Sequence, residues 1–517
     1  MKEEYLGKYK GPVGRQAGFS TIELMIAFVL ISIVLVGAVG ANFTAQYWGI
    51  NAQTANEALY KAKTKLEDLR SLVKQDFYQA TSMASTASID PTDPADASCI
   101  AGGLCYFVET TVTDLSSCSK YVEAKVEWQV DSYPKAMTRL FTYLTNSQEV
   151  IARGGDCILN EPEGDWENND PEEVGSLSYA PGKQFSGIDV LHKKIYTTTN
   201  TNPGFIIYNA PTAVGQNPAP LGTLNITVNS QIKTLNDVDV EEDLATGRTY
   251  AFVAVNATSS QLAVIDVTDW NNPTLTQRTL QSVDGYGSYP QGWRVFIYGS
   301  RLYMTTRETA GNEFHIFDIS TPTIPTEIGS GFELNRTVNA MVVRDQKISN
   351  VMHRLVFLAS DSNLKEIGVL DVTGDVISEL NSAAIDLPGN QDGFSLSLLG
   401  RDLYFGRQSN ASGPELYVLD ITDPTTSLPI ISQGEVGADV VDLEVTGRYV
   451  YVGTSKSGEE FQVWNSDFST WGALNEGRFT TYNFPRLAPL GFDIDGNWAY
   501  LISQFSTGDK LGVIYAQ

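Results

Sequence analysis

A short apolar run that ends in an aspartate recurs through the C-terminal two-thirds of the chain, and it limits the fold more than any other feature. It appears as Leu262-Ala-Val-Ile-Asp266, Phe314-His-Ile-Phe-Asp318, Ile367-Gly-Val-Leu-Asp371 and Leu416-Tyr-Val-Leu-Asp420. Successive aspartates are roughly 50 residues apart, and further strand-like runs precede each copy. Short strands grouped at this spacing predict the blades of a β-propeller.

Weaker copies flank these four, at 188–209, 440–464 and 492–516, so we expect seven blades over residues 179–517. The first and last copies are each short of a strand. Pairing strands from both ends would close the ring and leave no exposed sheet edge. The pattern L/F-x-V/I-x-D-V/I-T/S resembles the LVIVD-repeat propellers of exported proteins.

The N-terminus has a second distinctive pattern. Residues 1–18 carry four basic side chains and are followed by Gly18-Phe19-Ser-Thr-Ile-Glu23, and no residue from Leu24 to Ala41 is charged. At about 1.5 Å per residue that run gives roughly 27 Å of helix, close to the thickness of a bilayer core. The glycine and the polar break stand before the apolar run, whereas an ordinary secretory signal is cleaved after it.

This arrangement resembles the class III signal of type IV pilins and pseudopilins. The resemblance implies a leader, residues 1–18, that a prepilin peptidase cuts between Gly18 and Phe19, after which Phe19 is N-methylated. It also implies that Glu23 takes part in filament assembly by pairing with the N-terminal amine of a neighbouring pilin subunit. We expect a single-pass inner-membrane protein before assembly, then a cell-surface or pilus location with the C-terminal part outside. A plain signal anchor is the alternative.

The remaining N-terminal residues predict a pilin-like head. A helix is expected over 19–78, with 19–43 in the membrane or filament core, because apolar residues recur at spacings of three and four beyond the membrane run. Three strand-like runs follow, at 105–113, 121–130 and 137–144, in a head over 79–157. The acidic segment 158–178 is expected to be a linker. The predicted fold class is an α+β pilin-like N-terminal part, a long helix packed on a small antiparallel sheet, followed by an all-β propeller.

All four cysteines fall in or next to the head: Cys99, Cys105, Cys118 and Cys157. An exported segment meets an oxidising compartment, so two disulfides are expected, and four cysteines allow three pairings. Free thiols are the alternative.

The charge and the motifs exclude several functions. Lys and Arg total 35 against 61 Asp and Glu, a net charge of −26, which repels nucleic acids. No catalytic motif is present, so we expect no enzyme activity and no cofactor. The recurring aspartates are interpreted as turn caps, and Asp493-Ile-Asp495-Gly as a hairpin turn. Calcium binding by clustered carboxylates is kept as an alternative.

Together these patterns predict a minor, tip-located type IV pilin whose propeller binds an extracellular protein, glycan or surface. A pseudopilin of a secretion or DNA-uptake machine is the first alternative. A membrane-anchored propeller scaffold that never polymerises is the second.

Overall fold

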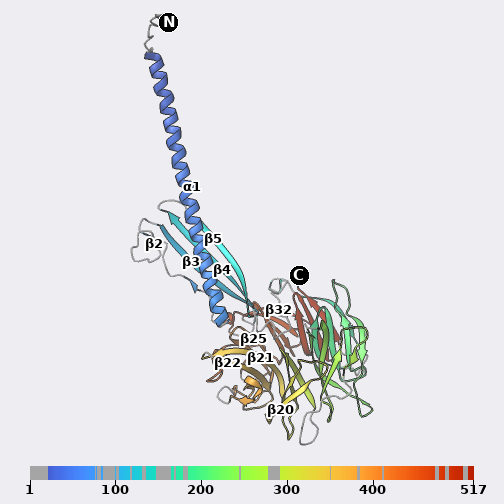
Figure 1. Cartoon of the computed structure of the whole chain (residues 1–517). Coiled ribbons are helices and arrows are strands. Elements are labelled where there is room, and N and C mark those ends of the chain that lie inside the picture. The colour runs from blue at the N-terminus through green and yellow to red at the C-terminus, as the bar shows by residue number, and fades with distance from the viewer. Residues whose placement is uncertain are drawn as a thin grey trace, which may run out of the picture. The chain divides into compact units, whose positions relative to one another are not determined.

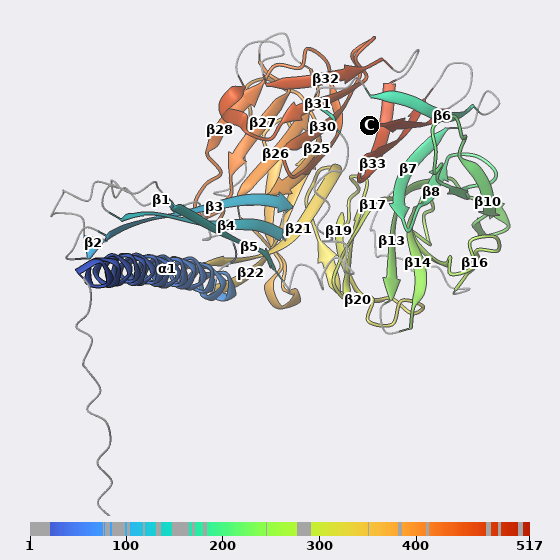
Figure 2. The same ribbon diagram turned by 90° about the horizontal axis from the view of Figure 1, so that it is seen from above.

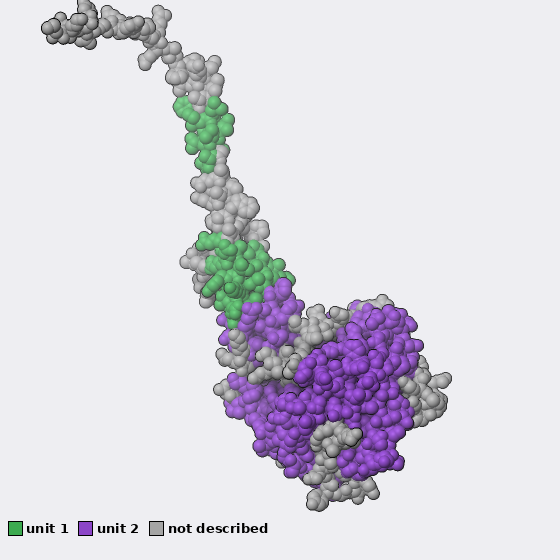
Figure 3. Space-filling model, turned by 45° about the vertical axis from the view of Figure 1, so that its right-hand side comes forward, with its two compact units in different colours: residues 1–67, 84–110, 124–140 green, residues 68–83, 111–123, 141–517 purple. Residues whose placement is uncertain are grey.

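The computed structural model describes residues 21–75, 77, 83–84, 99–100, 104–116, 119–130, 136–146, 165–167, 171–178, 184–243, 246–276, 291–349, 351–380, 385–409, 413–471, 477–483, 488–504 and 510–516. The chain divides into two compact units (Figure 3). The first unit comprises residues 1–67, 84–110 and 124–140, and the second comprises 68–83, 111–123 and 141–517.

Helix α1 (Thr21–Gln75) is continuous over 55 residues (Figure 1). Towards its C-terminus Ala58, Ala62 and Leu66 recur at every fourth position and are buried, which is the stripe expected of a helix with one covered face. The Tyr106 hydroxyl donates a hydrogen bond to the Thr54 carbonyl oxygen at 3.4 Å. Towards its N-terminus, large apolar side chains are exposed; they are Met25, Phe28, Val29, Leu30, Ile31, Ile33, Val34, Leu35, Val36 and Val39.

Five strands follow α1 and form one sheet in the order β1-β3-β4-β5, with β2 paired to β3. Alternate residues of β4, including Val122, Val126 and Trp128, are buried, as expected for a strand with one covered face. The strands are β1 (Met83–Ala84), β2 (Cys99–Ile100), β3 (Leu104–Ser116), β4 (Ser119–Val130) and β5 (Ala136–Thr145).

The predicted α+β fold class is wrong for this chain, which is nearly all β. Helix α1 accounts for 55 of 517 residues. The described residues also include short 3₁₀ segments, such as η2 (Thr373–Asp375) and η4 (Phe468–Thr470). The prediction gave a single helix too much weight, whereas strands hold most of the buried apolar side chains.

No helix in the described part of the chain is both long enough and apolar enough to cross a membrane. The predicted single-pass location in the inner membrane is therefore wrong. That prediction considered the uncharged run from Leu24 to Ala41 by itself, whereas in the structure it is one part of the longer α1.

The second unit contains seven four-stranded antiparallel sheets among its described residues. Their strands are β7 (Phe185–Leu191), β8 (Lys194–Thr199), β9 (Phe205–Asn209) and β10 (Ala219–Leu224); β13 (Leu235–Asp243), β14 (Arg248–Val255), β15 (Leu262–Asp266) and β16 (Thr274–Leu275); β17 (Gly292–Tyr298), β18 (Arg301–Thr306), β19 (Phe314–Asp318) and β20 (Thr326–Phe332); β21 (Val338–Ile348), β22 (Val351–Ser360), β23 (Ile367–Asp371) and β24 (Ser378–Glu379); β25 (Gly393–Leu399), β26 (Asp402–Arg407), β27 (Leu416–Asp420) and β28 (Ile430–Gly434); β29 (Val440–Thr446), β30 (Tyr449–Thr454), β31 (Phe461–Asn465) and β32 (Arg478–Tyr482); and β33 (Ala488–Asp495), β34 (Trp498–Gln504), β35 (Lys510–Tyr515) and β6 (Glu172–Ser178). A separate hairpin joins β11 (Thr227–Val228) to β12 (Gln231–Ile232).

The first strands of these sheets form a ring. Each contacts the first strand of the next sheet, and β33 contacts β7. The last sheet takes its fourth strand from the other end of the unit, because β35 pairs with β6 (Figure 2). This is the pairing of strands from both ends that the repeat pattern predicts, and β6 lies in the acidic segment that was expected to be a linker.

The recurring aspartates lie at the ends of third strands, as the repeat pattern predicts. A carboxylate oxygen of Asp266 accepts a hydrogen bond from the Thr268 amide at 3.0 Å, and Asp420 accepts one from Thr422 at 2.7 Å. The same bonds join Asp318 to Ser320 and Asp371 to Thr373. Their interpretation as turn caps is confirmed.

Candidate ligand site on the propeller axis

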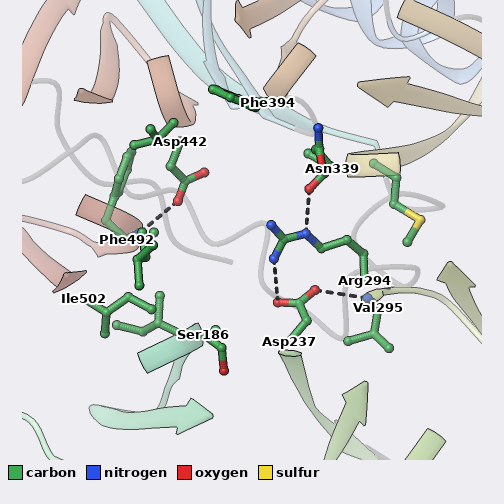
Figure 4. A pocket seen from close by; sticks show the side chains of 16 residues that line it. Ser186, Asp237, Arg294, Val295, Asn339, Phe394, Asp442, Phe492 and Ile502 are labelled. Carbon is green, nitrogen blue, oxygen red and sulfur yellow. Dashed lines mark hydrogen bonds and ion pairs between the residues drawn. The ribbon is translucent and has the colours of Figure 1, made fainter. Parts of the chain in front are cut away.

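A cavity of about 220 Å³ lies where the first strands of all seven sheets meet (Figure 4). Every sheet contributes to its wall, so the cavity lies on the axis of the ring. The lining residues are Ser186, Gly187, Ile188, Asp237, Arg294, Val295, Asn339, Ala340, Met341, Phe394, Val441, Asp442, Leu490, Gly491, Phe492 and Ile502.

A bulge at the same position of every first strand shapes this cavity. In each of the seven sheets, the first strand pairs with the second strand, and one residue near the start of the first strand has no partner in the register. A bulge bends its strand and redirects side chains, and bulges are common next to functional sites. The skipped residues are Ser186, Asn236, Trp293, Asn339, Phe394, Val441 and Leu490.

Among the described residues that line the cavity, Arg294 is the one basic side chain. Its Nε donates a hydrogen bond to the backbone oxygen of Asn339 at 2.6 Å, and its Nη1 lies 3.7 Å from Asp237 Oδ1. The guanidinium also lies 5.2 Å from the centre of the Trp293 ring. Within the described residues Nη2 has no hydrogen-bond partner, and 29% of the side chain is exposed. The guanidinium is therefore held in place but keeps donors available to the cavity.

Two aspartates on the wall tie neighbouring sheets together. Asp237 accepts a hydrogen bond from the Val295 amide at 3.1 Å, and Asp442 accepts bonds from the amides of Phe492 at 2.8 Å and Leu443 at 2.9 Å. Burial raises the pKa of the Asp237 carboxyl, although Arg294 opposes the rise. Burial likewise raises the pKa of Asp442 to about 6, against the effect of its two backbone bonds.

A second acidic layer lies one pleat further along the same strands. Asp189, Asp239 and Asp493 accept hydrogen bonds from the amides of Val240, Ile297 and Val190 in the neighbouring sheets. Burial, followed by the charge of Asp189, raises the pKa of both Asp239 and Asp493. In the part of the chain that the structure describes, no group of three or more His, Cys, Asp or Glu residues is arranged to hold a metal ion.

The structure tests few of the residues singled out in the N-terminal sequence. Gly18, Phe19, Cys118 and Cys157 lie outside the described residues. Glu23 belongs to the first turn of α1. Cys99 and Cys105 are directly opposite each other in the register of β2 and β3.

Sequence reasoning missed both aspartate layers on the axis. The predicted hairpin turn is present between β33 and β34, where Gly496 has a φ of 64°, but Asp493 itself lies within β33. The available signal was the alternation of acidic residues in Asp237-Val-Asp239, at the same place in the repeat as Asp442-Leu-Glu444 and with Asp493 in the place of Asp239.

A second missed feature is a buried glutamate just before the third strand of several sheets. Glu313, Glu366, Glu415 and Glu460 are buried, and Gln261 occupies the same place in the second sheet. Glu415 Oε2 accepts hydrogen bonds from the amides of Val436 and Gly437, both at 2.9 Å. This residue therefore fixes the loop that follows the fourth strand.

Comparison with known proteins supports the propeller. Residues 293–331 match the LVIVD repeat family, and they fall within the single sheet from β17 to β20. The chain contains an LVIVD repeat. The predicted repeat-containing, propeller-like domain is confirmed.

Two solved structures are similar to about two thirds of this chain, at low sequence identity. A chain of the mitotic checkpoint complex is similar over 68% of this chain and 92% of its own length, with 14% identity and a TM-score of 0.46. Raptor of Chaetomium thermophilum is similar over 68% of this chain and 29% of its own, with 13% identity and a TM-score of 0.43. No curated protein matches the chain.

Proposed function

We propose that this chain is a minor pilin-type subunit, incorporated at the tip of a filament, that displays its propeller for adhesion or ligand binding. The observation that carries this proposal is the uncovered apolar part of α1, where 66% of Phe28 and 73% of Val36 are exposed. Such an apolar surface needs a partner. Parallel helices of neighbouring subunits match it in shape and polarity.

The Gly18-Phe19-Ser-Thr-Ile-Glu23 motif supports the same proposal. Processing by a prepilin peptidase between Gly18 and Phe19 would leave an amine a few residues before α1 begins. Glu23 is the only charged residue between Phe19 and Phe43. A charge among apolar helices needs a partner of opposite sign, and the amine of an adjacent subunit supplies one.

The size of the propeller supports the proposed tip placement. The unit that contains seven sheets is much larger than the five-stranded sheet next to α1. A subunit that carries so large a domain would crowd its neighbours if it were repeated along a filament shaft. Terminal incorporation avoids this.

Recovery of the chain in sheared filaments tests the proposal. Glu23→Ala should remove the chain from the filament fraction, and mass spectrometry of wild-type filaments should find N-methylated Phe19. Glu67→Ala is the matched control, because it removes the same charge from an exposed position of the same helix. Equal recovery of the Glu23 and Glu67 variants, or an intact Met1 in filaments, would contradict the proposal. Immunogold label along the whole shaft would contradict the tip placement alone.

A further inference from the structure

The polar groups in the axial cavity are unevenly satisfied. The carboxylate of Asp442 already accepts two backbone hydrogen bonds, whereas Arg294 makes one hydrogen bond and leaves Nη2 without a partner in the described residues. A ligand in this cavity must therefore offer acceptor oxygens to Arg294. The carboxylates of Asp237 and Asp442 can still accept bonds from ligand donors, because a carboxylate has about four lone-pair sites.

The charges in the cavity disfavour a charged ligand. Asp237 and Asp442 lie in the same wall as Arg294, so an anion meets two carboxyl groups beside one guanidinium. A cation meets the guanidinium of Arg294 in the same small space. A neutral ligand with adjacent donors and acceptors satisfies both kinds of group at no net charge cost.

The size of the axial cavity and its apolar lining narrow the class of ligand further. The cavity, at about 220 Å³, is below the roughly 300–1,000 Å³ of sites for drug-sized ligands. Its wall adds apolar side chains beside the charged ones; they are Ile188, Met341, Phe394, Leu490, Phe492 and Ile502. The C–H face of a sugar ring fits such a wall, because the electron-rich face of an aromatic ring attracts partly positive hydrogens.

We infer that the axial cavity binds one neutral pyranose unit of a glycan, with vicinal hydroxyls between Arg294 and Asp442 and the ring against the apolar wall. This inference names a ligand class for the adhesive role proposed above. It rests on that proposal only for the biological role of the binding. The site itself is a property of the propeller.

Gly491 provides a way to close the cavity without disturbing its charges. A Cβ built on Gly491 would lie 3.4 Å from Asp442 Oδ2, 3.7 Å from Ile188 Cγ2 and 3.9 Å from the Ile502 methyl. These are ordinary contacts with three lining residues, so an added side chain enters the cavity. Gly491→Ala narrows it by one methyl group, and Gly491→Val blocks it.

The test is binding to the purified full chain at pH 7, measured by saturation-transfer NMR and calorimetric titration. The neutral probes are methyl α-mannopyranoside, methyl β-galactopyranoside and N-acetylglucosamine, and galacturonate and glucosamine are matched charged probes. At least one neutral probe should bind more tightly than both charged ones. Arg294→Gln should weaken it at least about tenfold, because a hydrogen bond from a charged donor is lost. Gly491→Val should abolish binding and Gly491→Ala should weaken it.

Arg448→Gln is the control for loss of a positive charge, since 60% of that side chain is exposed outside the cavity, and it should leave binding unchanged. Thermal unfolding establishes that each variant is folded, and Gly491→Ala replaces Gly491→Val if the latter is not. The inference is overturned if none of the three neutral probes binds, if a charged probe binds best, or if binding survives in the Arg294 and Gly491 variants. The amount of each of these variants recovered in sheared filaments should equal that of wild type. Loss of sugar binding and loss of filament assembly are therefore distinguishable results.

Discussion

Trp166 meets Tyr451 edge-on, with ring centroids 5.3 Å apart and an interplanar angle of 78°. The indole is completely buried, and Phe461 lies against it at 6.1 Å between centroids. Trp166 comes from the acidic segment that the sequence marked as a linker. One aromatic side chain therefore fixes that segment to the sixth sheet of the propeller.

We expect Trp166→Ala to lower the free energy of unfolding by about 3–5 kcal/mol, since it empties a large apolar site that cannot fully collapse. Urea unfolding of the full chain measures this change. Trp270→Ala is the control, because that ring is partly exposed and has Lys194 over one face at 4.0 Å. A Trp166 variant as stable as the Trp270 variant would show that the segment is held elsewhere.

Glu415→Ala should destabilise the propeller by about 2–4 kcal/mol, because two backbone amides lose a buried charged acceptor. Glu415→Gln should cost less, since an amide oxygen can still accept and Gln261 occupies the equivalent place in another sheet. Thermal unfolding of both variants measures the difference. If the Ala and Gln variants are equally stable, the hydrogen bonds from Val436 and Gly437 contribute little to stability.

Stability should fall between about pH 4 and pH 7. The pKa of Asp442 is raised to about 6 in the folded chain, so folding binds a proton in this interval. The stabilisation is complete below the ordinary pKa near 4 and is lost as the pH rises through about 6. A shift of two units corresponds to at most about 3 kcal/mol. The raised pKa values of Asp237, Asp239 and Asp493 act in the same direction.

Asp442→Asn isolates the contribution of this carboxyl. Asparagine keeps an acceptor for the Phe492 amide but does not titrate, so the pH profile of its unfolding free energy should be flatter than that of wild type. Chemical denaturation at a series of pH values measures both profiles. Parallel profiles would assign the pH dependence to the other aspartates.

We predict that Cys99 and Cys105 form a disulfide, which leaves Cys118 and Cys157 as the second pair. Residues opposite each other in an antiparallel pair have Cα atoms about 4.5–5.5 Å apart, within the range that a disulfide bridges. Cys99 and Cys105 are such a pair. Peptide mapping without reduction identifies the linkage, and a peptide that joins Cys99 to Cys157 or Cys118 would contradict the prediction.

The sequence revealed the repeats but not the site, for a physical reason. Apolar runs such as Leu262–Asp266 and Leu416–Asp420 are visible because every residue before the aspartate is buried. The bulges leave no comparable pattern, since residues as different as Ser186, Trp293 and Leu490 occupy them. What those positions share is backbone register, which depends on the neighbouring strand.

The N-terminal part shows the opposite error. The uncharged run and the periodic residues of α1 were clear, and they led to an α+β class and a membrane span that the structure does not support. Conversely, the acidic composition around Glu172 and Glu173 predicted a linker there. They pair with Tyr515 and Ile514 in β35, a partner so distant in sequence that composition could not indicate it.

This distant pairing also sets an order of events during synthesis. β6 leaves the ribosome before the other strands of the ring, yet Ser178 must wait for Lys510 before the two can pair. At roughly 5–20 residues per second, that delay is on the order of tens of seconds. Throughout it, the unpaired edge of β6 and the half-built ring are open to other chains, so a factor that shields them during translation should raise the yield of this protein more than that of a propeller closed by local strands.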